Sequence, residues 1–104
     1  MIPVYEVRIS AEASADLLMI HRYIREDSPQ NADLVIDRLL KVIDELNAFP
    51  RRYKIYQSAS KPDRVVRSVS ISSFTVYYRI LEAERIVRIL TIRRGARRQP
   101  KRFK

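Results

Sequence analysis

Ser28-Pro29 constrains the fold more than any other feature, because it separates two helices that must lie against each other. The serine oxygen can accept hydrogen bonds from the free N–H groups of a helix start, and a proline at the first helical position loses no needed donor. Apolar residues before the pair recur at spacings of four, three and four: Ala13, Leu17, Ile20 and Ile24. Ser10 can cap this first helix, which is predicted over 11–26.

A second apolar stripe follows the pair and predicts a longer helix. Its members are Ala32, Val35, Leu39, Val42, Ile43 and Leu46. This helix should end before Pro50, because the residue preceding a proline is steered out of the α region. Two helices joined by one or two residues form an antiparallel hairpin. Most of the acidic residues are expected on its outer faces: Asp16, Glu26, Asp27, Asp33, Asp37, Asp44 and Glu45.

The remaining periodic segments are strands. Residues 4–9 alternate between apolar and charged side chains, the period of a half-buried strand. Three more strand signals cover 65–71, 74–81 and 85–92, while 51–63 is interpreted as a loop with room for a short strand near 53–56. The predicted order is β-α-α-β-β-β. We expect an α+β fold in which an antiparallel sheet packs on the N-terminal helical hairpin, with 1–104 forming a single domain.

One face of this sheet should bury itself against the helices, and the other should remain open. On strand 74–81 the better core set is Phe74, Val76, Tyr78 and Ile80. The alternation then puts Tyr77 and Arg79 on the open side. Arg67 and Arg88 also interrupt apolar strands and are predicted to join them there. The open face should therefore carry cations and aromatic rings.

The charge is divided unevenly along the chain. The net charge is +9, but residues 1–50 hold five Lys and Arg against nine Asp and Glu, a net −4. Residues 51–104 hold sixteen against three, a net +13. A surface of that sign concentrates anions, whether nucleic acid or an acidic protein segment, within about 8 Å at physiological salt.

Several classes of protein and chemistry are disfavoured. With no cysteine, the chain can form neither a disulfide nor a thiolate metal site, which is compatible with a reducing cytosol. No run of 18 apolar residues and no export signal occurs. The lone histidine, His21, is interpreted as an interhelical or surface residue, so no metal site, Ser-His-Asp triad or cofactor is predicted. Gly95 is interpreted as a turn that ends the last strand rather than a phosphate loop.

Residues 92–104, IRRGARRQPKRFK, form a strongly basic ending. Such a run can be a solvated tail, a nucleic-acid contact, or a surface that recognises an acidic protein through arginine forks. For 93–98, which adjoin a strand and are better held, we favour protein recognition.

Several segments in order resemble the ParE toxins of the RelE/ParE superfamily, from bacterial type II toxin–antitoxin modules. They are Ala15-Asp16-Leu17 with Ile20 and Tyr23, the region 39–50, Arg67-Ser68-Val69-Ser70-Ile71, Phe74-Thr75-Val76-Tyr77-Tyr78-Arg79-Ile80, and Ile89-Leu90-Thr91-Ile92-Arg93-Arg94-Gly95-Ala96-Arg97. The ending is similar to a strand followed by His-Gly-Ala-Arg, with Arg94 replacing the histidine. The resemblance implies a cytoplasmic toxin that is silenced by a tightly bound antitoxin.

The superfamily contains two activities, and the residues of this chain indicate which of the two to expect. ParE-type toxins block DNA gyrase without being enzymes, whereas RelE-type toxins cleave mRNA on the ribosome. Catalytic RelE-like members have an arginine at the position of Thr75 and often a tyrosine or histidine near the C-terminus, where this chain has Phe103. Both departures favour a non-enzymatic toxin with no catalytic residue. A metal-independent endoribonuclease remains the alternative, with phosphate handled by a cluster of Arg67, Tyr77, Arg79, Arg94 and Arg97.

The resemblance and the charge pattern together predict two binding sites. Arg93, Arg94, Arg97 and Arg98 are assigned to the target, expected to be DNA gyrase. Arg67, Tyr77, Arg79 and Arg88 are assigned to a cognate ParD-like antitoxin, which should form a hetero-oligomer with the toxin. We expect the antitoxin to supply an acidic, amphipathic segment that lies along the helical hairpin and reaches the open sheet face.

Overall fold

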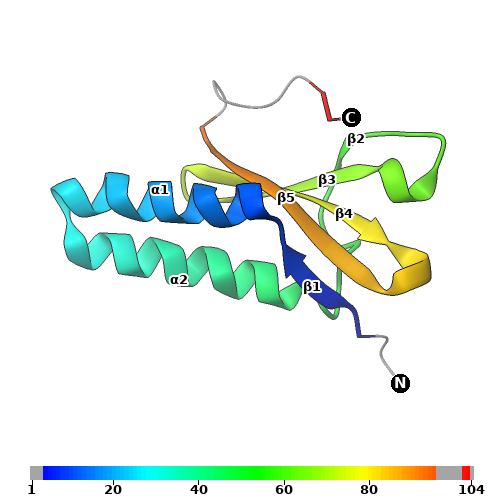
Figure 1. The fold of residues 1–104 in the computed structure, drawn as a ribbon, viewed down its shortest axis with the longest axis horizontal. Helices are drawn as coiled ribbons and strands as arrows, with labels where there is room; N and C mark the ends of the chain where they lie inside the picture. Colours follow the sequence, from blue (N-terminus) through cyan, green and yellow to red (C-terminus); the bar gives the residue numbers. More distant parts are fainter. Residues whose placement is uncertain (1–3, 96–101, 104) are drawn as a thin grey trace.

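Two helices joined at Ser28 form the antiparallel hairpin that the sequence predicts (Figure 1). The computed structural model describes residues 4–95, 102 and 103. In it α1 (Ala11–Asp27) ends where the Ser28 N–H donates to the Ile24 carbonyl, at 2.8 Å. α2 (Pro29–Glu45) begins where the Ser28 Oγ accepts from the Asn31 N–H, at 3.3 Å. One serine therefore caps both helices and fixes the reversal.

The described part of the chain contains one five-stranded sheet in the order β1-β5-β4-β3-β2. Its strands are β1 (Glu6–Ile9), β2 (Ile55–Gln57), β3 (Val66–Ile71), β4 (Phe74–Leu81) and β5 (Ile86–Arg94). Short 3₁₀ turns, η1 (Pro62–Arg64) and η2 (Glu82–Glu84), connect β2 to β3 and β4 to β5. The short strand expected near 53–56 is β2, placed two residues later.

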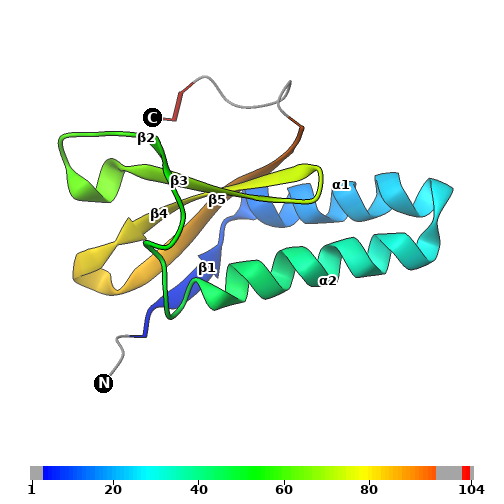
Figure 2. The same ribbon diagram turned by 180° about the vertical axis from the view of Figure 1, so that it is seen from behind.

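The sheet is mixed, whereas the sequence predicted an antiparallel one. β2 to β5 form the antiparallel meander, but β1 runs parallel to β5. A parallel pair needs a long crossover, and the helical hairpin supplies it between β1 and the meander. Figure 2 shows the consequence from behind: β1 and β5 lie beside the base of the hairpin, and the tip of the hairpin projects away from the strands.

The core lies between the hairpin and one face of the sheet, as predicted. The helices contribute Ala13, Ile20, Val35, Leu39, Ile43 and Leu46, and β4 contributes Phe74, Val76, Tyr78 and Ile80. Tyr78 is fully buried, and its hydroxyl donates to the Pro50 carbonyl at 2.7 Å. This hydrogen bond ties the centre of the sheet to the segment that follows α2.

Asp16 was expected on the outer face of the hairpin, but its carboxylate faces the sheet instead of solvent. It accepts from the Thr91 hydroxyl at 2.6 Å and from the Ile92 N–H at 2.9 Å. β1 pairs with β5 only as far as Ile89, so Asp16 provides the acceptor that the strand lacks beyond that point. His21 does lie between the helices, 2.8 Å from the Asp33 carboxylate, as predicted.

Replacing Asp16 should therefore destabilise the fold at the joint between α1 and β5. We expect Asp16→Ala to lower the free energy of unfolding by about 1–3 kcal/mol, because Thr91 is buried and loses its acceptor. Urea denaturation monitored by circular dichroism measures this. Asp37→Ala, on an exposed part of α2, is the control. Equal stability of the two variants would contradict the role of Asp16.

Candidate functional site

The face of the sheet that points away from the core gathers arginines from β4 and β5. Residues directly opposite each other in an antiparallel pair point to the same face, and Arg79 lies opposite Arg88. Thr75 lies opposite Arg93 on the same face. The structure thus confirms the predicted placement of Arg79 and Arg88 on the open face and adds Arg93 to it.

A β-bulge explains how Arg88 and Arg93 share a face although five positions separate them. Tyr77 pairs with Thr91 but Tyr78 pairs with Ile89, so Leu90 is an extra residue in β5. The shift reverses the alternation of β5 beyond it. The buried residues of β5 show this bulge in the sequence: Val87 and Ile89 are two positions apart, as in a regular strand, but Ile89 and Ile92 are three positions apart.

Arg67 does not lie on the open face, which corrects the sequence prediction. It lies opposite Tyr78 and therefore on the core side of the sheet. Its guanidinium donates to the Tyr53 carbonyl at 2.7 Å and, more weakly, to the Arg51 carbonyl at 3.4 Å. The alternation of β3 groups Arg67 with Val69 and Ile71, on the core side. It could not reveal the carbonyl acceptors that hold a cation there, because they come from the loop after α2. Arg67 secures that loop.

Tyr77 is on the predicted face but is covered by two other rings. Its exposed fraction is 0%. The Tyr56 ring centroid lies 4.8 Å away and the Phe103 centroid 5.2 Å away. The Gln57 side chain holds Phe103 in place, accepting from the Phe103 N–H at 2.7 Å and donating to its carbonyl at 2.9 Å. Residues 102–103, drawn in red, accordingly lie beside β2 in Figures 1 and 2.

This cover changes the acid–base chemistry of Tyr77. Burial, aided by the neighbouring Tyr56, raises the pKa of Tyr77 to about 12, although nearby Arg93 acts in the opposite direction. The phenol is therefore protonated at neutral pH. It is poorly suited to act as a general base, whose pKa should lie near the working pH.

Three arginines line a cavity of about 610 Å³ beside this aromatic group. Arg64 comes from η1, Arg79 from β4 and Arg88 from β5, and Leu81, Leu90 and Phe103 line the same cavity. The carboxylates of Glu12 and Asp63 line it as well, so three positive charges stand against two negative ones. Burial and the positive charges of Arg64 and Arg88 lower the pKa of Arg79, although Asp63 acts in the opposite direction. The excess of positive charge favours an anion nearby. We call this group the arginine cavity.

Arg93 and Arg94 lie at the other end of β5, against α1. The Arg93 guanidinium is 3.7 Å from the Glu12 carboxylate, and the Arg94 guanidinium lies over the Tyr23 ring, 4.3 Å from its centroid. Both line a groove of about 260 Å³ with Met19, Tyr23 and Phe74. Met19 is 67% exposed and Tyr23 54%. An apolar strip thus adjoins two of the four arginines assigned to the target, whereas Arg97 and Arg98 lie outside the described residues.

The last strand ends in the turn that the sequence predicts at Gly95. This glycine has φ +64°, which side-chain-bearing residues rarely adopt, and its N–H donates to the Ser73 carbonyl at 2.7 Å. The bond links the end of β5 to the β3–β4 turn and helps to hold Arg93 and Arg94.

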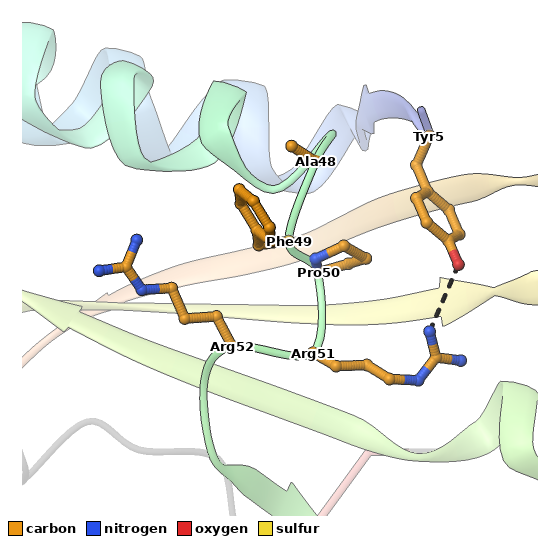
Figure 3. Close-up of a pocket in the computed structure, with 6 residues that line it drawn as sticks. All are labelled: Tyr5, Ala48, Phe49, Pro50, Arg51 and Arg52. Carbon is orange, nitrogen blue, oxygen red and sulfur yellow. Dashed lines mark hydrogen bonds between the residues drawn. The ribbon is translucent and has the colours of Figure 1, made fainter. Parts of the chain in front are cut away.

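A second hollow lies at the opposite end of the hairpin and was not predicted. It is lined by Tyr5, Ala48, Phe49, Pro50, Arg51 and Arg52 and has a volume of about 610 Å³ (Figure 3). Arg51 donates to the Tyr5 hydroxyl at 3.3 Å and to the Glu82 carboxylate at 2.8 Å. The arginine hydrogen bond and that from Tyr5 lower the pKa of Glu82. This network joins the residue before β1, the loop after α2 and η2, so sequence spacing does not predict it.

The described residues contain no group of three His, Cys, Asp or Glu side chains that would hold a metal ion. In the same residues, no helix has the length and apolar character needed to cross a membrane.

Comparison with known proteins identifies the family. The fold is similar to the chromosomal ParDE toxin–antitoxin system from P. aeruginosa, with TM-score 0.71, 18% identity, and coverage of 88% of this chain and 97% of that one. It is also similar to the toxin–antitoxin complex RelBE2 from Mycobacterium tuberculosis, with TM-score 0.63, 19% identity, and coverage of 88% and 98%. The archaeal RelE–RelB complex from Pyrococcus horikoshii OT3 gives TM-score 0.67 at 15% identity, with coverage of 90% and 98%.

No curated protein sequence matches the chain. The family of ParE toxins of type II toxin–antitoxin systems, parDE, matches residues 7–99, nearly the whole chain. The chain therefore belongs to the ParE toxin family, within the RelE/ParE superfamily whose fold it shares.

Proposed function

We propose that this toxin acts by binding DNA gyrase and that a cognate ParD-like antitoxin neutralises it in a hetero-oligomeric complex. The observation that carries the proposal is the chemistry of the open sheet face. Among its described residues, Arg79, Arg88 and Arg93 supply guanidinium groups, but neither Thr75 nor Phe103 has a group that titrates near neutral pH. Tyr77 is buried and protonated there. Such a face can bind anions and is poorly equipped for proton transfer.

We assign gyrase binding to the end of β5. Arg93 and Arg94 are held there by the strand and by Tyr23, so they lose little conformational freedom when they bind. Their planar forks suit carboxylates of a protein target. Arg97 and Arg98 follow after Gly95 and Ala96 in the sequence and are proposed to extend the same surface. Gyrase is inside the cell, so this proposal places the toxin in the cytoplasm.

We assign antitoxin binding to the groove between α1 and β5 together with the arginine cavity. Met19 and Tyr23 offer apolar contacts for the aliphatic anchors of an amphipathic segment. Arg79 and Arg88 offer charge for its acidic side chains. Arg67 is engaged with backbone carbonyls, and Tyr77 lies under Phe103, so both support this surface from below.

A ribosome-dependent mRNA endoribonuclease, as in RelE-type toxins, is the second candidate. The arginine cavity favours it, because three guanidinium groups could neutralise the phosphate of an RNA strand without a metal. This activity would require a proton acceptor other than Tyr77 in its covered, protonated state.

Two assays on the same purified protein separate these functions. We expect inhibition of gyrase supercoiling and no ribosome-dependent mRNA cleavage. The double variant Arg93→Glu and Arg94→Glu should need at least about tenfold more protein for the same inhibition, since removing such charge contacts commonly costs more than 1.4 kcal/mol. Arg38→Glu, on an exposed part of α2, is the matched control. Message cleavage without any effect on gyrase would reject the proposal in favour of the second candidate.

The charge of the open face should control how fast the antitoxin associates. We expect Arg79→Glu with Arg88→Glu to slow association about tenfold or more at low salt, because these charges steer an acidic partner. Stopped-flow mixing at low and at high ionic strength measures this, and the difference should shrink at high salt. Arg38→Glu again serves as control. Association rates that are insensitive to both substitution and salt would place the antitoxin elsewhere.

Met19→Asp should change the dissociation rate of the toxin–antitoxin complex more than its association rate. The apolar contact is lost, and a negative charge is introduced where an acidic segment would lie. We expect the toxin–antitoxin complex to dissociate at least about tenfold faster, as hydrophobic anchors act mainly through dissociation. Surface plasmon resonance gives this rate, and Leu40→Asp, an exposed apolar residue on α2, controls for the added charge. Equal dissociation rates for the two variants would contradict the groove assignment.

A further inference from the structure

Phe103 packs into a site on the sheet that contacts both its backbone and its ring. The Gln57 amide pairs with the Phe103 N–H and carbonyl, at 2.7 and 2.9 Å. These two hydrogen bonds involve only the backbone, so any residue except proline could make them. The Tyr77 and Tyr56 rings, with centroids 5.2 and 6.2 Å from that of Phe103, favour an aromatic side chain. We call the site formed by Tyr56, Gln57 and Tyr77 the aromatic socket.

The aromatic socket opens directly onto the arginine cavity. Phe103 lines that cavity together with Arg64, Arg79 and Arg88. A segment whose aromatic ring fills the socket therefore places its neighbouring residues near three guanidinium groups and two carboxylates, those of Glu12 and Asp63. The excess of positive charge would attract acidic neighbours and repel basic ones.

The residue that precedes Phe103 has the wrong charge for this position, because it is the basic Arg102. Gln57 is also the last residue of β2, one of the two edge strands of the described sheet, so the socket lies at a sheet edge that a second chain can approach. A partner segment that offers the same ring and backbone with acidic neighbours would match both the socket and the cavity.

We propose that the aromatic socket is a peptide-binding site for an extended acidic segment with one aromatic residue, and that Phe103 is an internal competitor for it. The partner is the antitoxin, which on this point rests on the function proposed above. Binding of the antitoxin at this site then requires Phe103 to leave. The toxin's own Phe103 consequently limits access to the aromatic socket.

A synthetic probe tests the site without the antitoxin. We use the fluorescently labelled peptide acetyl-Glu-Asp-Phe-Glu-Asp-amide and measure binding by anisotropy. Phe103→Ala should bind it about tenfold more tightly than the natural chain, because apparent affinity falls with the fraction of sites that are occupied internally. Adding Gln57→Ala to Phe103→Ala should remove the gain. Replacing the peptide's Phe by Ala, or its acids by Lys, should also remove it.

Matched variants separate this site from other surfaces. Phe49→Ala removes an exposed ring from the hollow of Figure 3 and should leave peptide affinity unchanged. Arg79→Gln with Arg88→Gln should weaken binding to Phe103→Ala, whereas Arg38→Gln should not. Equal affinity of the natural chain and Phe103→Ala would overturn the proposal.

The titration of Tyr77 reports whether the socket has been uncovered in a folded protein. The pKa of Tyr77 is raised to about 12 mainly by burial, so removing the Phe103 ring should lower it toward the ordinary value of about 10. NMR of tyrosine rings labelled with carbon-13 resolves this pKa, with Tyr77→Phe for assignment. Phe103→Leu provides a second, milder variant if Phe103→Ala unfolds. An unchanged pKa of Tyr77 in either folded variant would show that Phe103 does not cover the socket.

The antitoxin then supplies an independent comparison. We expect it to associate faster with Phe103→Ala than with the natural chain. If the antitoxin associates with both proteins at the same rate and the peptide binds both with the same affinity, this inference fails. Gyrase inhibition and its reversal by the antitoxin remain separate tests of the proposed function.

Discussion

Burial of one face of the sheet against the helical hairpin fixes where the side chains of the site point. Phe74, Val76, Tyr78 and Ile80 must face the helices, so Thr75, Tyr77 and Arg79 face away from them. The buried Tyr78 hydroxyl bonded to the Pro50 carbonyl makes this orientation expensive to reverse, because a slip of one residue would bury arginine in its place. The bulge at Leu90 then brings Arg93 onto the face that already holds Arg88. Core packing and one extra residue together create the cationic surface.

The sequence predicted the parts of this fold that depend on neighbouring residues. The N-cap of the second helix at Ser28, both amphipathic stripes and the core face of β4 follow from local spacing and capping chemistry, and the structure confirms each of them. Prediction was wrong where a distant segment decides the outcome. The parallel pairing of β1 with β5, the carbonyl partners of Arg67 and the sheet-facing carboxylate of Asp16 all join residues far apart in the sequence.

In the candidate site, too, the features set by neighbouring residues were predicted and those set by distant segments were not. Arg79 and Arg88 were placed correctly because alternation along a strand is local. The cover on Tyr77 was missed, because it comes from Phe103 through Gln57 and no spacing rule links those positions. Sequence analysis therefore identified the chemical character of the face but not which part of it is accessible. The accessible part is the arginine cavity, and the covered part is aromatic.

The paired arginines are informative because they weaken the sheet. Like charges directly opposite each other on neighbouring strands are destabilising, and Arg79 faces Arg88 in this way. Arg64 adds a third positive charge, and burial lowers the pKa of Arg79 further. A chain selected for stability alone would gain from a neutral residue at either position. Asp63 offsets part of the repulsion, and the positive charge that remains is what the proposed anionic partner would meet.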